Sequence, residues 1–152
     1  MLSMQEISDR FEIQDLMVRY CTAVDAHDWD AYEAVFTPDA FIDYSAMGGP
    51  AGGVKEVRQF LEMAMPTFAG HQHLIANSAI EFDGDTAHAR TMCHNPMVID
   101  RGNGVTETFF CGLWYVDTLV RTPEGWRIKN RVEEKSYFHN VPEDFQVPSS
   151  DG

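Results

Sequence analysis

The sequence predicts an α+β fold in which helices come first and a mostly antiparallel sheet follows. Apolar residues recur at helical spacing in two stretches before residue 66. After residue 70, four runs rich in β-branched and aromatic residues are separated by the turn sequences DGD, DRGNG and RTPEG. A group of helices followed by a group of strands is typical of α+β proteins.

Three helices are expected in the N-terminal half. Ser3 and Glu6 have the spacing of a capping box, which starts the first helix close to the N-terminus. Its apolar stripe consists of Ile13, Leu16, Met17, Tyr20 and Val24, and its polar side of Asp9, Arg10, Asp15 and Arg19. Asp28 or Asp30 caps a short second helix that Pro38 ends. The third helix runs through 54–65 and Pro66 closes it.

The strands are expected in the remaining segments. A first strand covers 40–47 and is followed by the turn or loop MGGPAGG. The four later runs are 71–82, 86–99, 105–120 and 125–138. Strict alternation in 71–82 puts His73 on one face with His71, Ile75 and Asn77. We expect one domain over 1–141 and a C-terminal tail over 142–152.

Composition and charge argue against several classes of function. The formal charge of −13 and the dispersed basic residues argue against a nucleic-acid partner. No apolar run approaches the ~18 residues needed to span a bilayer, so we expect no membrane insertion. The N-terminus lacks the pattern of a secretory signal, which favours a cytoplasmic location. Cys21, Cys93 and Cys111 are widely spaced and are expected to be reduced, buried thiols.

Several segments resemble the nuclear transport factor 2-like superfamily. YCTAVDAHDWDAYEAVF resembles its Tyr-x4-Asp segment at the end of the first helix, and IDYSAM resembles a strand that presents a tyrosine. HQHLIANSAIEFDGD resembles the strand that carries the family's histidine, ten residues before Asp83, and GWRIKNRVEEKSYF resembles the closing strand. The likeness is greatest to the SnoaL-like branch, which contains scytalone dehydratase, bile-acid 7α-dehydratase and the hexachlorocyclohexane dehydrochlorinase. It implies a cone-like barrel, with a curved mixed sheet wrapped around three helices and enclosing a pocket.

The resemblance implies a set of catalytic residues. His73 would be the proton-abstracting base, Asp25 would orient it, and Tyr20 and Tyr44 would bind the substrate oxygen or assist the leaving group. An imidazole held by a carboxylate suits the removal of a proton beside a carbonyl. On a regular helix, however, Tyr20 and Asp25 would be ~140° apart. We therefore expect the helix to unwind near Ala26.

Four further residues are candidates for substrate binding. An arginine of the family's closing strand aligns near Lys135, with Arg131 as the alternative. His94 lies in a central strand and could line the cavity, and Trp114 could shape an apolar ligand site. The expected substrate is a small apolar cyclic or polyketide-like molecule.

The expected activity is that of a lyase, a dehydratase in particular, which works without a cofactor. An isomerase or dehydrohalogenase using the same pair, a non-catalytic pocket for a lipophilic ligand, and a small subunit of a ring-hydroxylating dioxygenase remain alternatives. His71, His73 and Asp25 could hold a metal, but no clearly spaced further ligand accompanies them, so no metal is expected. We expect a homo-oligomer, a trimer rather than a dimer, through exposed strand residues such as Leu113 and Tyr115.

Overall fold

The fold is α+β, as predicted, with three helices on a curved sheet of seven strands. A computed structural model describes residues 1–146. The helices are α1 (Met4–Ala26), α2 (Trp29–Glu33) and α3 (Val54–Ala64), with short 3-10 turns at Ser45–Met47 and Met65–Thr67. The strands are β1 (Phe36–Asp43), β2 (Ala51–Gly53), β3 (Gly70–His71), β4 (Leu74–Asp83), β5 (Thr86–Gly102), β6 (Val105–Thr122) and β7 (Gly125–His139). None of the helices in the described residues is both long and apolar enough to cross a lipid bilayer.

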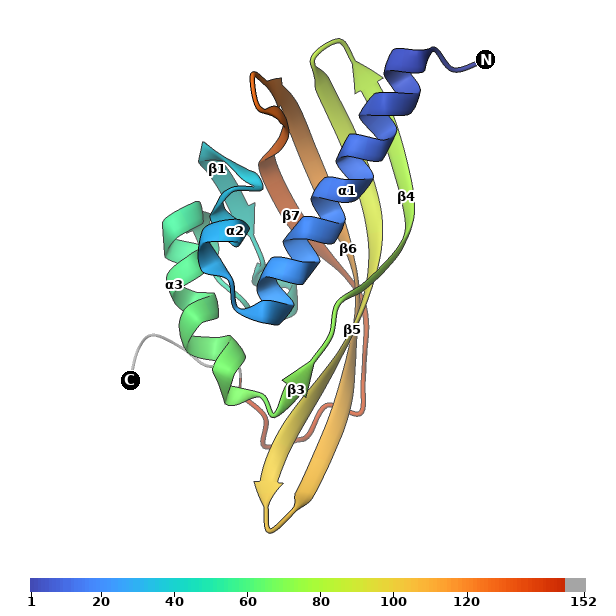
Figure 1. Cartoon of the computed structure of the whole chain (residues 1–152). Coiled ribbons are helices and arrows are strands. Elements are labelled where there is room, and N and C mark those ends of the chain that lie inside the picture. The colour runs from blue at the N-terminus through green and yellow to red at the C-terminus, as the bar shows by residue number, and fades with distance from the viewer. Residues whose placement is uncertain (147–152) are drawn as a thin grey trace.

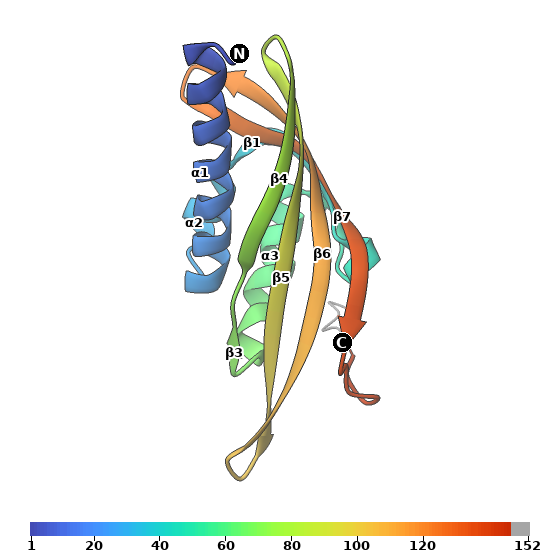
Figure 2. The same ribbon diagram turned by 90° about the vertical axis from the view of Figure 1, so that its right-hand side faces the viewer.

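The strands form one sheet in the order β2-β1-β7-β6-β5-β3, with β4 also paired to β5. Only the β1–β7 pair is parallel among the described strands. Helix α1 crosses one side of the strands, and the β5–β6 hairpin extends beyond the helices (Figures 1 and 2). The long twisted strands can therefore close around the helices and leave a pocket on the inner side.

Helix α1 packs as its periodicity predicts. All five residues of the predicted stripe are buried. The capping box is present too, because the Ser3 hydroxyl accepts a hydrogen bond from the Glu6 backbone N–H and the Glu6 carboxylate accepts one from the Ser3 N–H. The first helix therefore begins where the sequence indicates.

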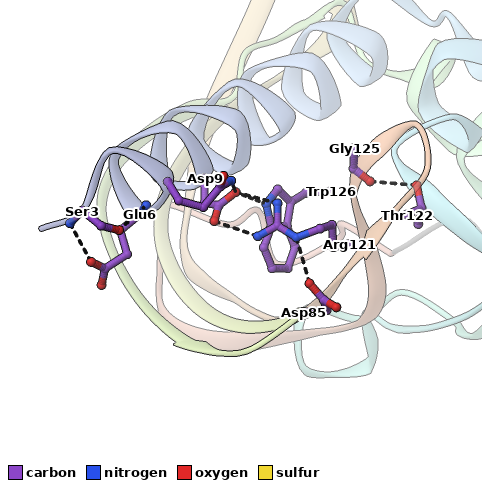
Figure 3. A network of polar contacts seen from close by, with 9 residues as sticks. Ser3, Glu6, Asp9, Asp85, Arg121, Thr122, Gly125 and Trp126 are labelled. Carbon is purple, nitrogen blue, oxygen red and sulfur yellow. Dashed lines mark hydrogen bonds and ion pairs between the residues drawn. The ribbon is translucent and has the colours of Figure 1, made fainter.

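Asp9 corrects the predicted polar side of α1, because it is buried. Its carboxylate accepts two hydrogen bonds from the Arg121 guanidinium at 2.8 Å and one from the Trp126 indole N–H at 3.0 Å. Arg121 also pairs with Asp85 on the adjoining turn (Figure 3). This network attaches the N-terminal part of α1 to the β6–β7 hairpin.

Two irregularities in the strands also differ from the sequence prediction. Pro38 lies inside β1 rather than at a helix end, at a place where the pairing of β1 with β7 shifts register, so its missing N–H costs no regular ladder bond. In β4 the register shifts between Ile75 and Ser78. The extra residue turns both Ile75 and Ile80 toward the core, although strict alternation would separate them.

The sheet face that we expected to be exposed is the inner one. Leu113 and Tyr115 are 4% and 1% exposed, so the prediction that they form an apolar outer surface was wrong. Both side chains point to the helices because their register on β6 matches that of Phe109 and Cys111. Of the expected tail over 142–152, the described part packs on the fold through Phe145, which contacts Phe68 and Phe109. Residues 147–152 lie outside the described residues.

Candidate active site

A pocket of about 320 Å³ lies between the helices and the inner side of the sheet. Its walls are mainly apolar: α3 contributes Phe60 and Leu61, β6 contributes Phe109 and Leu113, and the segment after β7 contributes Phe145. Few polar side chains interrupt this lining, namely Tyr20, Tyr44, His73, Asn95, Tyr115 and Glu133. An apolar cavity of this size with a few polar groups is typical of small-molecule sites.

Asp25 and His73 meet at the edge of this pocket. The Asp25 Oδ1 atom lies 2.6 Å from His73 Nδ1, and its Oδ2 atom accepts the His73 backbone N–H at 2.9 Å. These two bonds fix both the ring and the backbone of His73. With Nδ1–H donated to the carboxylate, the other ring nitrogen, Nε2, keeps its lone pair on a ring that lines the pocket.

Helix α1 reaches this position without unwinding, which corrects the sequence prediction. It remains helical through Ala26, and His27 then turns the chain in the left-handed region with φ 55°. Tyr20 lines the pocket, whereas Asp25 does not and instead reaches His73 from the helix end. The two residues therefore serve one site from different directions on a regular helix.

Two further histidines continue the network away from the pocket. His71 Nδ1 lies 3.2 Å from the same Asp25 oxygen, and its Nε2 lies 3.0 Å from His27 Nε2. The His27 ring stacks between His71 and Trp29. Asp25 thus joins one histidine on the pocket wall to a pair of histidines behind it.

The environment keeps Asp25 ionised. Partial burial alone would raise its pKa, but the hydrogen bonds from His71 and His73 outweigh burial and hold the pKa well below the ordinary range of a carboxyl group. A permanent carboxylate both orients the His73 ring and stabilises the imidazolium that forms when Nε2 takes up a proton.

The donor set could also hold a metal ion. The Asp25 carboxylate and the nearest ring nitrogens of His71 and His73 lie within 4.8 Å of one another. Two imidazoles and one carboxylate are ligands that zinc and iron accept. A metal bound to both Nδ1 atoms would replace the protons that these nitrogens now share with Asp25.

Tyr20 and Tyr44 form a second polar pair in the pocket. Their hydroxyl oxygens are 2.6 Å apart, and both side chains are buried. Burial raises the pKa of each phenol well above its ordinary value, so both remain protonated hydrogen-bond donors. One hydroxyl donates to the other, which leaves one proton of the pair available to a ligand oxygen.

Arg131 lies behind these tyrosines and does not line the pocket. It is fully buried, bonded to Asp117 at 2.7 and 2.8 Å, and its guanidinium lies 4.1 Å from the ring centres of both Tyr20 and Tyr115. This packing holds the two aromatic rings in place.

The other candidate substrate-binding residues lie outside the lining. His94 and Trp114 face the opposite side of the sheet, where His94 bonds the Tyr137 hydroxyl and Trp114 stacks under Arg90. Lys135 is exposed, with its ammonium group above the Phe138 ring. The structure therefore brings Tyr20, Tyr44 and the Asp25–His73 pair to one pocket but places these three residues elsewhere.

Three polar residues of the pocket were not predicted as site residues from the sequence. Asn95 and Tyr115 alternate in phase with the inward-facing positions of β5 and β6, and Glu133 lies opposite Tyr115 on β7. Alternation in the strands could have indicated Asn95. Glu133, an acidic residue in a charged segment, has the pattern of a solvent-facing side chain.

The SnoaL-like domain model matches residues 5–132. The chain belongs to the SnoaL-like family. An uncharacterized protein of Mycobacterium tuberculosis is 48% identical over 139 residues, which cover 90% of this chain and 92% of that protein. The family prediction is thereby confirmed.

Solved structures share the fold. A candidate aromatic ring hydroxylase of Novosphingobium aromaticivorans has a TM-score of 0.79 and 30% identity, covering 89% of this chain and 94% of its own. A candidate scytalone dehydratase of the same organism has a TM-score of 0.77 and 20% identity, covering 96% of each chain. A hexachlorocyclohexane dehydrochlorinase of Novosphingobium barchaimii has a TM-score of 0.75 and 18% identity, covering 94% and 97%. At such identities the last two show the fold alone.

Proposed function

We propose that this protein is a lyase of the dehydratase type, which needs no cofactor for its chemistry and eliminates water from a small cyclic hydroxyketone. One observation carries the proposal: the His73 ring lines an apolar pocket while its Nδ1 atom is held 2.6 Å from the Asp25 carboxylate. This arrangement leaves Nε2 as a base of fixed direction toward whatever occupies the pocket.

The reaction uses the groups in the pocket as follows. His73 Nε2 removes a proton from the carbon beside the ligand's carbonyl group, and Asp25 stabilises the resulting imidazolium. The electron pair of the broken C–H bond forms the new C=C bond as the hydroxyl group on the next carbon leaves. The His73 imidazolium returns that proton to the departing oxygen, which is released as water, and the free base is restored. The Tyr20–Tyr44 pair supplies a hydrogen bond to the carbonyl oxygen, where negative charge develops.

The comparisons support this class of reaction in part. Dehydratases and dehydrochlorinases occur among the structures that share the fold. Both reactions begin with removal of a proton from carbon and end with loss of a group from the neighbouring carbon. The apolar walls and limited volume favour a compact, neutral, cyclic substrate over a charged metabolite.

A suitable probe is 3-hydroxy-1-tetralone, because loss of water converts it to 1-naphthol, whose fluorescence reports turnover. The wild type should form 1-naphthol faster than buffer alone. His73→Gln should fall to the buffer rate while still binding 1-tetralone, and the exposed residue His88 provides a matched control, His88→Gln, that should keep the full rate. An undiminished rate in His73→Gln would contradict the proposed base.

The same assay separates the alternatives. Binding of 1-tetralone without turnover of any probe would favour a non-catalytic pocket. Release of chloride from hexachlorocyclohexane without formation of 1-naphthol would favour a dehydrohalogenase. Co-purification with a larger metal-containing chain would favour a ring-hydroxylase subunit.

A further inference from the structure

Glu133 is a pocket carboxyl group that the proposed mechanism does not use. It lies on β7, is half-buried and lines the cavity. In residues 1–146 it makes no hydrogen bond or ion pair, although Arg131 is two positions away on the same strand and bonds Asp117 instead. A carboxyl group in an apolar pocket without a partner is costly to ionise.

The sheet register places Glu133 between two of the pocket tyrosines. Its direct partner on β6 is Tyr115. On the other side of β7 lies β1, which runs parallel to it and pairs Asp43 with Val132. The next residue of each segment is Tyr44 and Glu133, so these two lie at the same level. Tyr115 in turn contacts Tyr20 with ring centres 5.4 Å apart, and Tyr20 bonds Tyr44. The four side chains therefore form the hydroxyl-rich end of the pocket.

We propose that Glu133 is a protonated hydrogen-bond donor that binds the oxygen of a neutral carbonyl ligand, together with the Tyr20–Tyr44 pair. The inference rests on the proposed function and deepens it, because it names the chemistry of the ligand that the same pocket accepts. Ketones and other neutral oxygen ligands would be bound, and carboxylates would be excluded at pH values where Glu133 ionises.

The surroundings of Glu133 support this protonation state. Burial raises its pKa to about 8, against a lowering effect of Arg131 and with a raising effect of Asp43. The other titratable groups around it are Tyr20, Tyr32, Tyr44, Cys93, Cys111 and Tyr115. Burial raises the pKa of every one of them, to about 12 for the two thiols. The Arg131 pKa is raised further and that of Asp43 is lowered, so both stay charged.

Between pH 7 and pH 9, Glu133 is therefore the group in this set that changes charge. With a pKa of about 8 it is roughly nine-tenths protonated at pH 7 and one-tenth protonated at pH 9. If only the protonated form binds a ketone, the apparent affinity falls by about 10-fold over this range. Helix α3 contributes only apolar side chains to the lining, so it adds no titratable group to this pH dependence.

The test measures the dissociation constant of 1-tetralone at pH 7 and pH 9, which requires no turnover. The wild type should bind about 10-fold more weakly at pH 9. Glu133→Gln, which keeps a neutral side chain of the same shape, should bind equally at both pH values. Glu134→Gln is the matched control, because Glu134 is exposed and paired with Arg90, and it should behave as the wild type.

Several outcomes would overturn the inference: a pH-independent affinity in the wild type, an unchanged pH dependence in Glu133→Gln, or no binding of 1-tetralone at either pH. Binding of the ammonium form of 1-aminotetralin that is as tight at pH 7 as at pH 9 would also overturn it, since that requires a carboxylate already at pH 7. Carbon-13 NMR of the Glu133 carboxyl group in the wild type gives a second reading, which should titrate near pH 8. His73→Gln should keep this pH-dependent binding, so failure of the base and failure of Glu133 are distinguishable.

Discussion

Asp9 and Asp25 lie near opposite ends of helix α1 and have different roles: one stabilises the fold, and the other orients the proposed base. Asp9 and Asp25 each accept three or more hydrogen bonds, and both have pKa values well below the ordinary range. The main partner of Asp9 is Arg121, a permanent cation that holds no removable proton. The side-chain partners of Asp25 are imidazoles, and one of them, His73, also lines a pocket. The same acceptor thus fixes the fold at one end of the helix and orients a base at the other.

The largest expected effect follows from Asp25→Asn. Loss of the carboxylate removes the charge that stabilises the His73 imidazolium and allows the ring to adopt the other tautomer. We expect the rate of 1-naphthol formation to fall about 10²- to 10⁴-fold. A smaller loss than 10-fold, with the fold intact by circular dichroism, would mean that Asp25 has the structural role of Asp9.

Asp9→Asn should show the opposite behaviour. It leaves the half-buried Arg121 with a weaker partner, and we expect the free energy of unfolding to fall by about 2–3 kcal/mol. The turnover rate per folded molecule should stay unchanged, because the network lies at the other end of α1. Urea unfolding and the turnover assay measure the two quantities.

The pH dependence of the free energy of unfolding tests whether the charge of Asp9 causes the loss expected in Asp9→Asn. The folded-state pKa of Asp9 is depressed, so its contribution to stability is present above the ordinary pKa of 3.8 and is lost as pH falls below that value toward the folded-state pKa. The difference in unfolding free energy between the wild type and Asp9→Asn should therefore shrink as the pH is lowered from 5 to 2. A constant difference would mean that the charge of Asp9 contributes nothing.

Glu133 extends the contrast to a carboxyl group with a raised pKa. The folded protein keeps its proton up to about pH 8, whereas the unfolded chain releases it near 4.5. Stability is therefore reduced as pH rises from about 4.5 to 8, and Glu133→Gln should avoid this loss. We expect the variant to be more stable than the wild type at pH 8.5, by up to about 4–5 kcal/mol, and equal to it at pH 4, measured by urea unfolding.

The smallest expected effect concerns the start of α1. Ser3→Ala removes the capping hydroxyl, and we expect a loss of about 1 kcal/mol in unfolding free energy. Turnover should not change, since the capping box lies more than twenty residues from Asp25. A change in rate would show that the two ends of the helix are coupled.

Much of the fold could be predicted from the sequence because it depends on repeating patterns. The stripe from Ile13 to Val24 identifies α1, and turn residues separate the long strands. Patterns fail where one residue breaks the period. The register shift in β4 and the place of Pro38 within β1 depend on pairing partners far along the chain.

The site was predictable to a different extent. The resemblance pointed to Asp25 and His73, which the structure brings into hydrogen-bond contact, but the helical wheel argued for an unwinding that does not occur. Asp9 is buried and Glu133 lines the pocket, and neither position was predicted. From sequence alone an acidic residue is expected to face solvent, because the partner or cavity that receives it is formed by residues far along the chain. Tertiary contacts alone distinguish these carboxyl groups from the exposed ones.

The most direct test of the account is the exchange of hydrogen for deuterium at the carbon beside the carbonyl of 1-tetralone, followed by NMR in D₂O. This reaction needs a base in the pocket and no leaving group, so it isolates the step assigned to His73. The wild type should accelerate the exchange, Asp25→Asn should accelerate it far less, and His73→Gln should leave it at the buffer rate. Wild-type exchange in His73→Gln would contradict the assignment of the Asp25–His73 pair as the proton-abstracting group.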